Sequence, residues 1–208
     1  MPDVDTTAES GESSQPARFY QALKRFDQEN ARDPNFISVR GHLRPRELVY
    51  SEWLTEWVRR LRPDASEALL LAARSQHLCR WMIPRNSYEM TRDGYLLWRE
   101  DLKKFHAAKA AEILRQAGYS EEEILRVNAL NLKANRLTDP ECQTLEDALC
   151  LVTLERQLGD LIAKTPPEKM AEILKKTWRK MSEPAREEAL QLPLSPRALE
   201  LCKVAGIL

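Results

Sequence analysis

Hydrophobic residues recur with a helical period along most of the chain. Tyr50, Leu54, Trp57, Val58 and Leu61 share one face of a 3.6-residue repeat, and comparable stripes follow in later segments. No segment alternates apolar and polar residues as a half-buried strand does. The pattern predicts an all-α fold with about nine helices and no sheet. The predicted helices are 17–30, 45–62, 65–82, 93–117, 121–134, 140–163, 167–181, 184–191 and 196–205.

Polar residues and glycine mark several helix ends. Three pairs have the spacing of a capping box: Asp64 with Glu67, Ser120 with Glu123, and Thr165 with Glu168. Gly118 is well placed to end a long helix. Residues 83–92 contain Pro84 between two strong helical patterns, so this stretch is predicted to be an ordered loop.

Length and composition favour one domain. The chain has 208 residues, which is within the range of a single hydrophobic core, and we expect residues 16–208 to form one helical domain. Residues 1–15 are small, polar and acidic, which predicts a disordered tail. The N-terminal segment lacks the basic and apolar regions of a signal peptide, and no apolar run reaches membrane-spanning length. We therefore expect a cytoplasmic protein.

Charge and cysteine usage narrow the possible partners. Lys plus Arg and Asp plus Glu both total 32, so no net charge draws the chain to nucleic acid or to a membrane. The four cysteines form no C-x-x-C pair, which indicates reduced core thiols rather than a zinc knuckle. The chain has no Walker, Rossmann or G-x-S-x-G motif, which excludes the chemistries built on them.

Four ionisable residues fall on helical stripes that should face the core: Glu47, His77, His106 and Asp147. Burying such groups costs free energy unless they are paired or bind something. Two imidazoles and two carboxylates that meet in a core suit a divalent metal such as manganese, iron or zinc. Glu146 would add an oxygen ligand or hold an imidazole. The alternative is structural: the carboxylates cap helices or pair with arginines, and each histidine bonds a backbone carbonyl.

A second cluster interleaves cations with aromatic residues between residues 74 and 104. Its cations are Arg74, Arg80, Arg85, Arg92, Arg99, Lys103 and Lys104, and its aromatic residues are Trp81, Tyr88, Tyr95 and Trp98. Guanidinium groups suit phosphate or carboxylate, and aromatic faces suit a planar base, so the cluster predicts a site for a small anion such as a nucleotide. Lys133 is expected in the same pocket. The alternative is that the arginines lock the 83–92 loop.

The segment 173–182 contains four basic residues. Lys175, Lys176, Arg179 and Lys180 surround Trp178, but glutamates nearby dilute their field. We interpret this segment as a solvated helix face.

Several motifs resemble an uncharacterised family of the DUF4202 type, a domain of unknown function. They are QH-x-x-RW-x-x-PR-x-x-Y and GY-x-x-WR within residues 72–110, Q-x-LED within 139–155, and K-T-W-x-K-M-S within 173–182. The resemblance covers the chain from about residue 18 onward and implies no particular reaction.

The chain is also similar, more distantly, to the HD superfamily of metal-dependent phosphohydrolases, which are all-helical and use an H…HD…D ligand order. The segment AARSQH resembles the one that ends in their HD dyad, and TLEDALCLVTLE resembles the helix with their last aspartate, here Asp147. Two departures stand out: Gln76-His77 replaces His-Asp, and Glu47 replaces the first histidine.

The functional expectation is a metal-dependent hydrolase that acts on a small phosphorylated or nucleotide-like substrate. Its metal ligands would be Glu47, His77, His106 and Asp147, with Glu146 and Arg80 as catalytic residues. The substrate would contact Arg74, Trp81, Arg85, Tyr88, Arg92, Tyr95, Trp98 and Lys133. Two rivals remain open: a non-catalytic anion-binding or interaction module, and an iron oxygenase with an HD-like fold.

Overall fold

The computed structural model describes residues 16–134 and 138–207. These residues form ten α-helices and one small hairpin. The helices are α1 (Ala17–Asn30), α2 (Arg46–Leu61), α3 (Glu67–Ser75), α4 (Arg92–Gln116), α5 (Glu121–Leu132), α6 (Pro140–Val152), α7 (Leu158–Lys164), α8 (Pro167–Lys180), α9 (Glu183–Leu190) and α10 (Pro196–Val204). The helical prediction is confirmed, and most predicted bounds agree within two residues. The predicted disordered tail, residues 1–15, lies outside the described residues.

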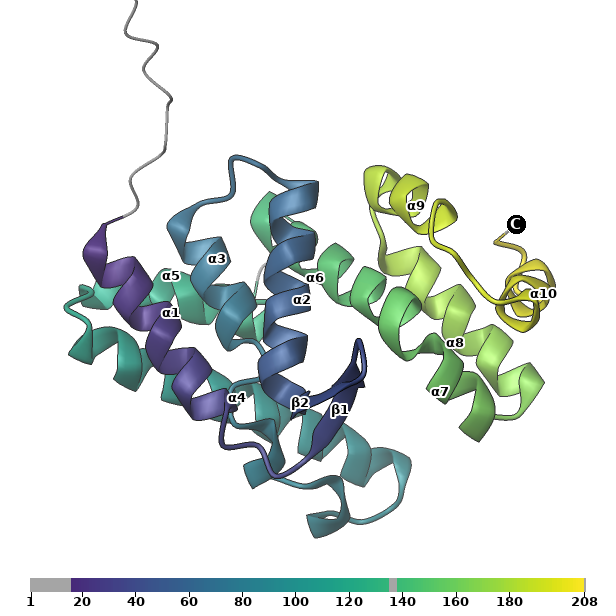
Figure 1. Ribbon diagram of the computed structural model, residues 1–208, viewed down its shortest axis with the longest axis horizontal. Helices are drawn as coiled ribbons and strands as arrows, with labels where there is room; N and C mark the ends of the chain where they lie inside the picture. The colour runs from purple at the N-terminus through teal and green to yellow at the C-terminus, as the bar shows by residue number, and fades with distance from the viewer. Residues whose placement is uncertain (1–15, 135–137, 208) are drawn as a thin grey trace, which may run out of the picture.

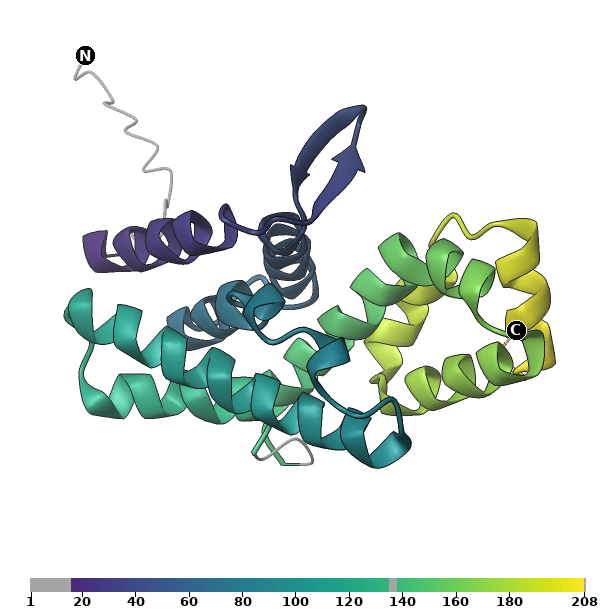
Figure 2. The ribbon, with the colours of Figure 1, turned by 90° about the horizontal axis from the view of Figure 1, so that it is seen from below.

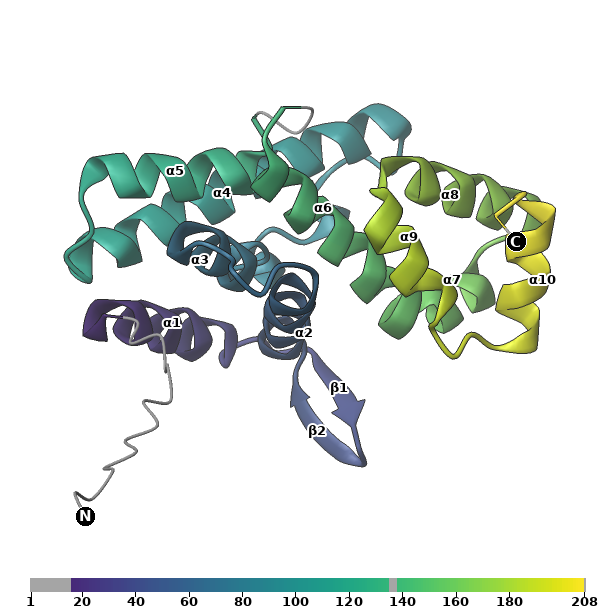
Figure 3. The same cartoon turned by 90° about the horizontal axis from the view of Figure 1, so that it is seen from above.

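Helix α6 runs through the middle of the molecule. Helices α1 to α5 gather on one side of it, and α7 to α10 form a smaller group on the other side (Figures 1 and 3). The two groups meet along α6, so side chains from this helix face both of them. A site at this junction can draw residues from segments far apart in the sequence.

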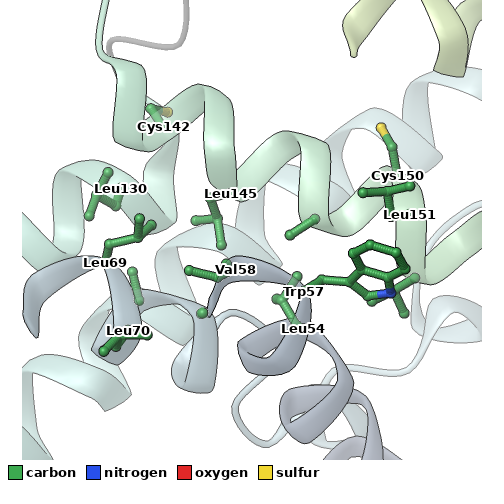
Figure 4. Close-up of a cluster of buried hydrophobic side chains, with 14 of the residues drawn as sticks. Leu54, Trp57, Val58, Leu69, Leu70, Leu130, Cys142, Leu145, Cys150 and Leu151 are labelled. Carbon is green, nitrogen blue, oxygen red and sulfur yellow. The ribbon is translucent and has the colours of Figure 1, made fainter. Parts of the chain in front are cut away.

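The main core lies between α2, α3, α5 and α6. Figure 4 shows the buried side chains that meet there, including Leu54, Trp57, Val58, Leu69, Leu70, Leu130, Cys142, Leu145, Cys150 and Leu151. Burying each large side chain contributes about 1.5–3 kcal/mol to stability. The indole nitrogen of Trp57 donates to Glu155 Oε2 at 2.8 Å, so its one polar atom is satisfied within the core.

Two of the predicted helix ends are confirmed and two are wrong. Ser120 and Glu123 form the predicted capping box at α5, and Gly118 ends α4 with a φ of 84°. Helix α3 begins one residue after Ser66, whose hydroxyl accepts from Leu69 N, so Asp64 is not its cap. Helix α8 follows Pro166 without a side-chain cap, so the pair Thr165 and Glu168 does not form the predicted box.

The prediction that the fold has no sheet is wrong. Strands β1 (Phe36–Val39) and β2 (His42–Pro45) form an antiparallel hairpin that projects from the helices (Figure 2). Its two-residue turn is Arg40-Gly41, and both residues have positive φ, as a tight hairpin requires. No strand residue is fully buried, Leu43 is 73% exposed, and Arg44 pairs with Glu52 of α2 at the surface. The strands therefore show no apolar alternation that would reveal them.

The predicted helix 65–82 ends early, and this difference shapes the site. Helix α3 stops at Ser75, whose hydroxyl bonds back to the Leu71 carbonyl at 2.8 Å. Cys79 then takes the left-handed conformation, with a φ of 55°, and its N–H donates to Asn30 Oδ1 of α1 at 3.0 Å. A left-handed backbone at a residue other than glycine costs free energy, so α1 holds this turn in place. The turn carries His77 and Arg80.

The predicted helix 140–163 is continuous in the structure but changes its hydrogen-bonding pattern part-way along. A π-helical turn, Thr153–Gln157, separates α6 from α7. Such turns are rare and are often found at functional sites. Within the described residues, no helix offers a long apolar stretch of the kind that crosses a bilayer.

Candidate functional site

A half-enclosed pocket lies where α2, α4, α6 and α8 meet. Its volume is about 240 Å³. Pockets for drug-sized ligands measure roughly 300–1,000 Å³, so this one suits a compact molecule. Thr153 and Gln157 of the π-helical turn are among its lining residues, which links the helix defect to the site.

Five cationic side chains from four different segments line the pocket: Arg80, Arg99, Lys103, Lys133 and Lys180. Among the described lining residues, Glu146 is the one carboxylate. A cleft lined mostly by one sign of charge concentrates ions of the opposite sign. The lining therefore carries more positive than negative side chains.

Arg80 lines the pocket and is fixed by an aromatic neighbour. It is half-buried, and within the described part of the chain its guanidinium has neither an ion pair nor a hydrogen bond. It stacks on Trp98 at 4.7 Å from the ring centroid, and the Trp98 indole is fixed by donation to the Ile83 carbonyl at 2.9 Å. Burial lowers the pKa of Arg80, but a guanidinium stays charged at neutral pH. Stacking thus holds the Arg80 guanidinium in place, and its N–H donors have no acceptor among the described residues.

Glu146 pairs with two of the other cations that line the pocket. Its carboxylate pairs with Lys133 and with Lys180, the latter at 3.4 Å. Burial alone would raise the pKa of Glu146, but the two ammonium groups outweigh it and lower the pKa below its usual value. Lys133 itself has a left-handed backbone, with a φ of 57°, at the end of α5. The carboxylate thus stands where an anionic ligand would meet these lysines.

His106 lies at the floor of the pocket and is 2% exposed. Its Nδ1 is 2.8 Å from the Leu78 carbonyl, and because a carbonyl only accepts, Nδ1 carries the hydrogen. Nε2 is therefore an unprotonated acceptor, and it is buried with no partner among the described residues. Burial lowers the pKa of His106 to about 4, so the ring is neutral at physiological pH.

His77 and Glu47 form a second polar pair beside His106. His77 Nδ1 lies 3.6 Å from Glu47 Oε2, and the two imidazole centroids are 6.1 Å apart. Burial raises the pKa of Glu47, with Arg80 and Arg46 opposing it, and burial together with Arg80 lowers the pKa of His77 well below its usual range. At neutral pH His77 is thus neutral.

The structure brings together only part of the predicted metal set. Glu47, His77 and His106 are neighbours, but Asp147 accepts from the N–H and hydroxyl of Ser182 and from Gln143, away from the pocket. Within residues 16–134 and 138–207, no group of three His, Cys, Asp or Glu side chains has a metal-binding arrangement. Asp147 thus bonds Ser182, the residue that precedes α9.

Most of the predicted substrate-binding residues have structural partners instead. Arg74 pairs with Asp27, Tyr88 donates to Asp101, and Arg85 donates to three backbone carbonyls of its own loop. None of the following lines the pocket: Arg74, Trp81, Arg85, Tyr88, Arg92, Tyr95 and Trp98. Arg85 confirms that an arginine locks the 83–92 loop, although its acceptors are carbonyls rather than carboxylates. Lys133, Arg80 and Glu146 do line the pocket.

A family model described as a domain of unknown function, DUF4202, matches residues 20–202. The chain belongs to the DUF4202 family. No curated protein and no solved structure matched it. The resemblance to the HD superfamily thus has no support from the comparisons, and it carries no weight for this DUF4202 protein.

Sequence reasoning missed several pocket residues of this DUF4202 protein. Lys180 was interpreted as part of a solvated face, but it reaches Glu146 across the pocket. Arg99 and Lys103 belong to the predicted cationic cluster, but they were not assigned to a site. Their signal was present in the sequence, since both precede His106 on the same helix by three or seven positions.

Proposed function

We propose that this DUF4202 protein binds a small phosphorylated ligand in the pocket between α2, α4, α6 and α8. The observation that carries the proposal is the guanidinium of Arg80, which lines the pocket without an ion pair or hydrogen bond in the described part of the chain. Four further cations surround the same space. A phosphate group offers the acceptor oxygens that the Arg80 guanidinium lacks, and its negative charge suits the other cations.

Inorganic phosphate and pyrophosphate test this proposal by isothermal titration at low and at high salt. The variant Arg80→Met should weaken binding by about ten- to a hundredfold, because a hydrogen bond to a charged group is worth about 1.5–3 kcal/mol. Arg92→Gln is the matched control, since Arg92 is an exposed arginine outside the pocket, and it should bind like the parent. Absence of binding by the parent protein at millimolar phosphate would overturn the proposal.

Hydrolysis of the bound ester with a divalent metal is a second candidate. One observation favours it: His106 Nε2 and Glu47 Oε2 are buried acceptors with no hydrogen-bond partner in the described residues, and Glu47 Oε2 lies 3.6 Å from His77 Nδ1. Water would attack the phosphorus, and the alcohol would leave with a proton to give inorganic phosphate. Elemental analysis of untagged protein, with release of nitrophenol from p-nitrophenyl phosphate in the presence of manganese, tests this candidate. Metal-free, inactive protein after reconstitution would reject it.

A further inference from the structure

Two residues that line the pocket carry buried hydrogen-bond acceptors that the described chain leaves without donors. His106 Nε2 and Gln76 Oε1 are both buried, and neither has a partner. Both residues line the pocket. An unsatisfied buried polar atom is costly, and such atoms in native proteins call for an explanation, often a water or a ligand. Two of them at the base of one pocket indicate that the ligand supplies the missing donors.

The phosphate itself cannot be that donor. The hydrogen on Nδ1 of His106 is committed to the Leu78 carbonyl, so Nε2 has only a lone pair to offer. An ionised phosphate oxygen also has only lone pairs, and it would be repelled. A hydroxyl group, by contrast, donates to Nε2 and accepts or donates at the Gln76 amide. The cationic side chains therefore suit the phosphate group of a ligand, and the buried acceptors suit hydroxyl groups of the same molecule.

We propose that the ligand is a phosphate monoester of a polyhydroxylated carbon chain, that is, a polyol or sugar phosphate. Its phosphate lies against Arg80 and the lysines, and its hydroxyl groups donate to His106 Nε2 and bond the Gln76 amide. This inference rests on the proposed phosphate-binding function and names the ligand class for the same pocket.

The lining argues against a nucleotide. Apart from the two imidazoles, Tyr50 is the one aromatic residue among the described lining residues. Trp98 is covered by Arg80, and neither Trp98 nor Trp81 reaches the pocket. A nucleobase binds best between aromatic or guanidinium faces, and it also needs more room than a small polyol. A compact ligand rich in hydroxyl groups matches both the volume of about 240 Å³ and the polar floor.

A matched pair of ligands tests the inference by isothermal titration of the full chain. Racemic glycerol 3-phosphate and propyl phosphate share a three-carbon chain and a phosphate, but only the former has hydroxyl groups. We expect glycerol 3-phosphate to bind at least about tenfold more tightly, since each buried acceptor that gains a donor is worth about a factor of ten. The variant His106→Asn keeps an amide donor near the Leu78 carbonyl and removes the Nε2 acceptor. It should abolish most of this preference.

The outcomes separate this inference from the proposed function. Equal affinity of the parent protein for the two esters overturns the polyol ligand and leaves phosphate binding intact. No binding of either ester or of inorganic phosphate overturns both. Stoichiometric metal in untagged protein, lost in folded His106→Asn, also overturns the inference, because the floor acceptors would then be metal ligands. The comparison of the two esters needs no variant, so it decides the question even if His106→Asn fails to fold.

Discussion

Asp147 and Ser182 are joined by two hydrogen bonds that tie α6 to the start of α9. The carboxylate accepts from the Ser182 N–H at 2.9 Å and from its hydroxyl at 2.7 Å. Gln143 donates to the same carboxylate at 2.9 Å. Asp147, which resembles a metal-binding aspartate in the sequence, therefore connects α6 to the start of α9 through hydrogen bonds.

The variant Asp147→Ala should lower the free energy of unfolding by about 1–3 kcal/mol. It removes a buried acceptor and leaves the donors of Ser182 and Gln143 without a partner. Phosphate affinity of the folded variant should stay at the parent value. Urea unfolding and isothermal titration measure the two quantities. Ser182→Ala, which loses only the hydroxyl bond, should show a smaller loss of stability. A folded Asp147→Ala protein with normal stability and no phosphate binding would contradict this role.

His106 predicts a loss of stability in mild acid. Its pKa is about 4 in the folded chain and near 6.5 in an unfolded one. Between these values the unfolded chain holds a proton that the folded chain lacks, so the free energy of unfolding falls as the pH drops from about 6.5 toward 4. At pH 5 this group alone should cost about 2 kcal/mol relative to pH 7.5. His77, whose pKa is also lowered, acts in the same direction.

Urea unfolding of the parent and of His106→Asn at pH 7.5 and pH 5 checks this prediction. The variant has no imidazole at this position, so its stability should change less between the two pH values. Carboxylates contribute to both proteins and cancel in the comparison. If NMR shows the His106 ring titrating near pH 6.5 in the folded protein, the explanation fails.

Glu146→Gln should increase the affinity for inorganic phosphate several-fold. The carboxylate pairs with Lys133 and Lys180, and a neutral amide of the same shape leaves both ammonium groups free for the ligand. Isothermal titration measures the change. Glu141→Gln is the control, because Glu141 pairs with Arg126 outside the pocket at 2.5 Å. Weaker phosphate binding by folded Glu146→Gln would instead indicate that the carboxylate helps to position the lysines.

Gly94 and Gly159 are two helical glycines at which replacement by alanine should have different effects on stability. A Cβ at Gly94, in the first turn of α4, would overlap the backbone carbonyl of Glu89, so Gly94→Ala should destabilise the protein by about 1–3 kcal/mol. A Cβ at Gly159 meets nothing within 4 Å, and Gly159→Ala should be neutral or stabilise by up to about 1 kcal/mol. Thermal unfolding compares the two variants. Equal stability of both would show that the 83–92 loop yields to the added methyl group.

The apolar period of the sequence was sufficient to predict the helices, because burial of one face is the dominant force on each of them. It also marked Glu47 and His106 as residues that turn inward, and both are almost fully buried, at 1% and 2% exposure. The same reasoning failed for the hairpin at 36–45, because no face of it is fully buried and its sequence therefore shows no clear alternation of apolar and polar residues.

Only the tertiary structure decided which polar residues meet. Asp147 and Glu146 are adjacent in sequence, but they point to α9 and to the pocket respectively, because a helix turns about 100° between neighbours. His77 and Arg80 leave the predicted helix because Asn30, from α1, holds the left-handed turn at Cys79. Lys180 reaches the pocket because the C-terminal end of α8 contacts α6, where Gln143 donates to the Lys180 carbonyl at 2.8 Å. Contacts of this kind depend on how elements distant in sequence pack together, and local periodicity does not encode them.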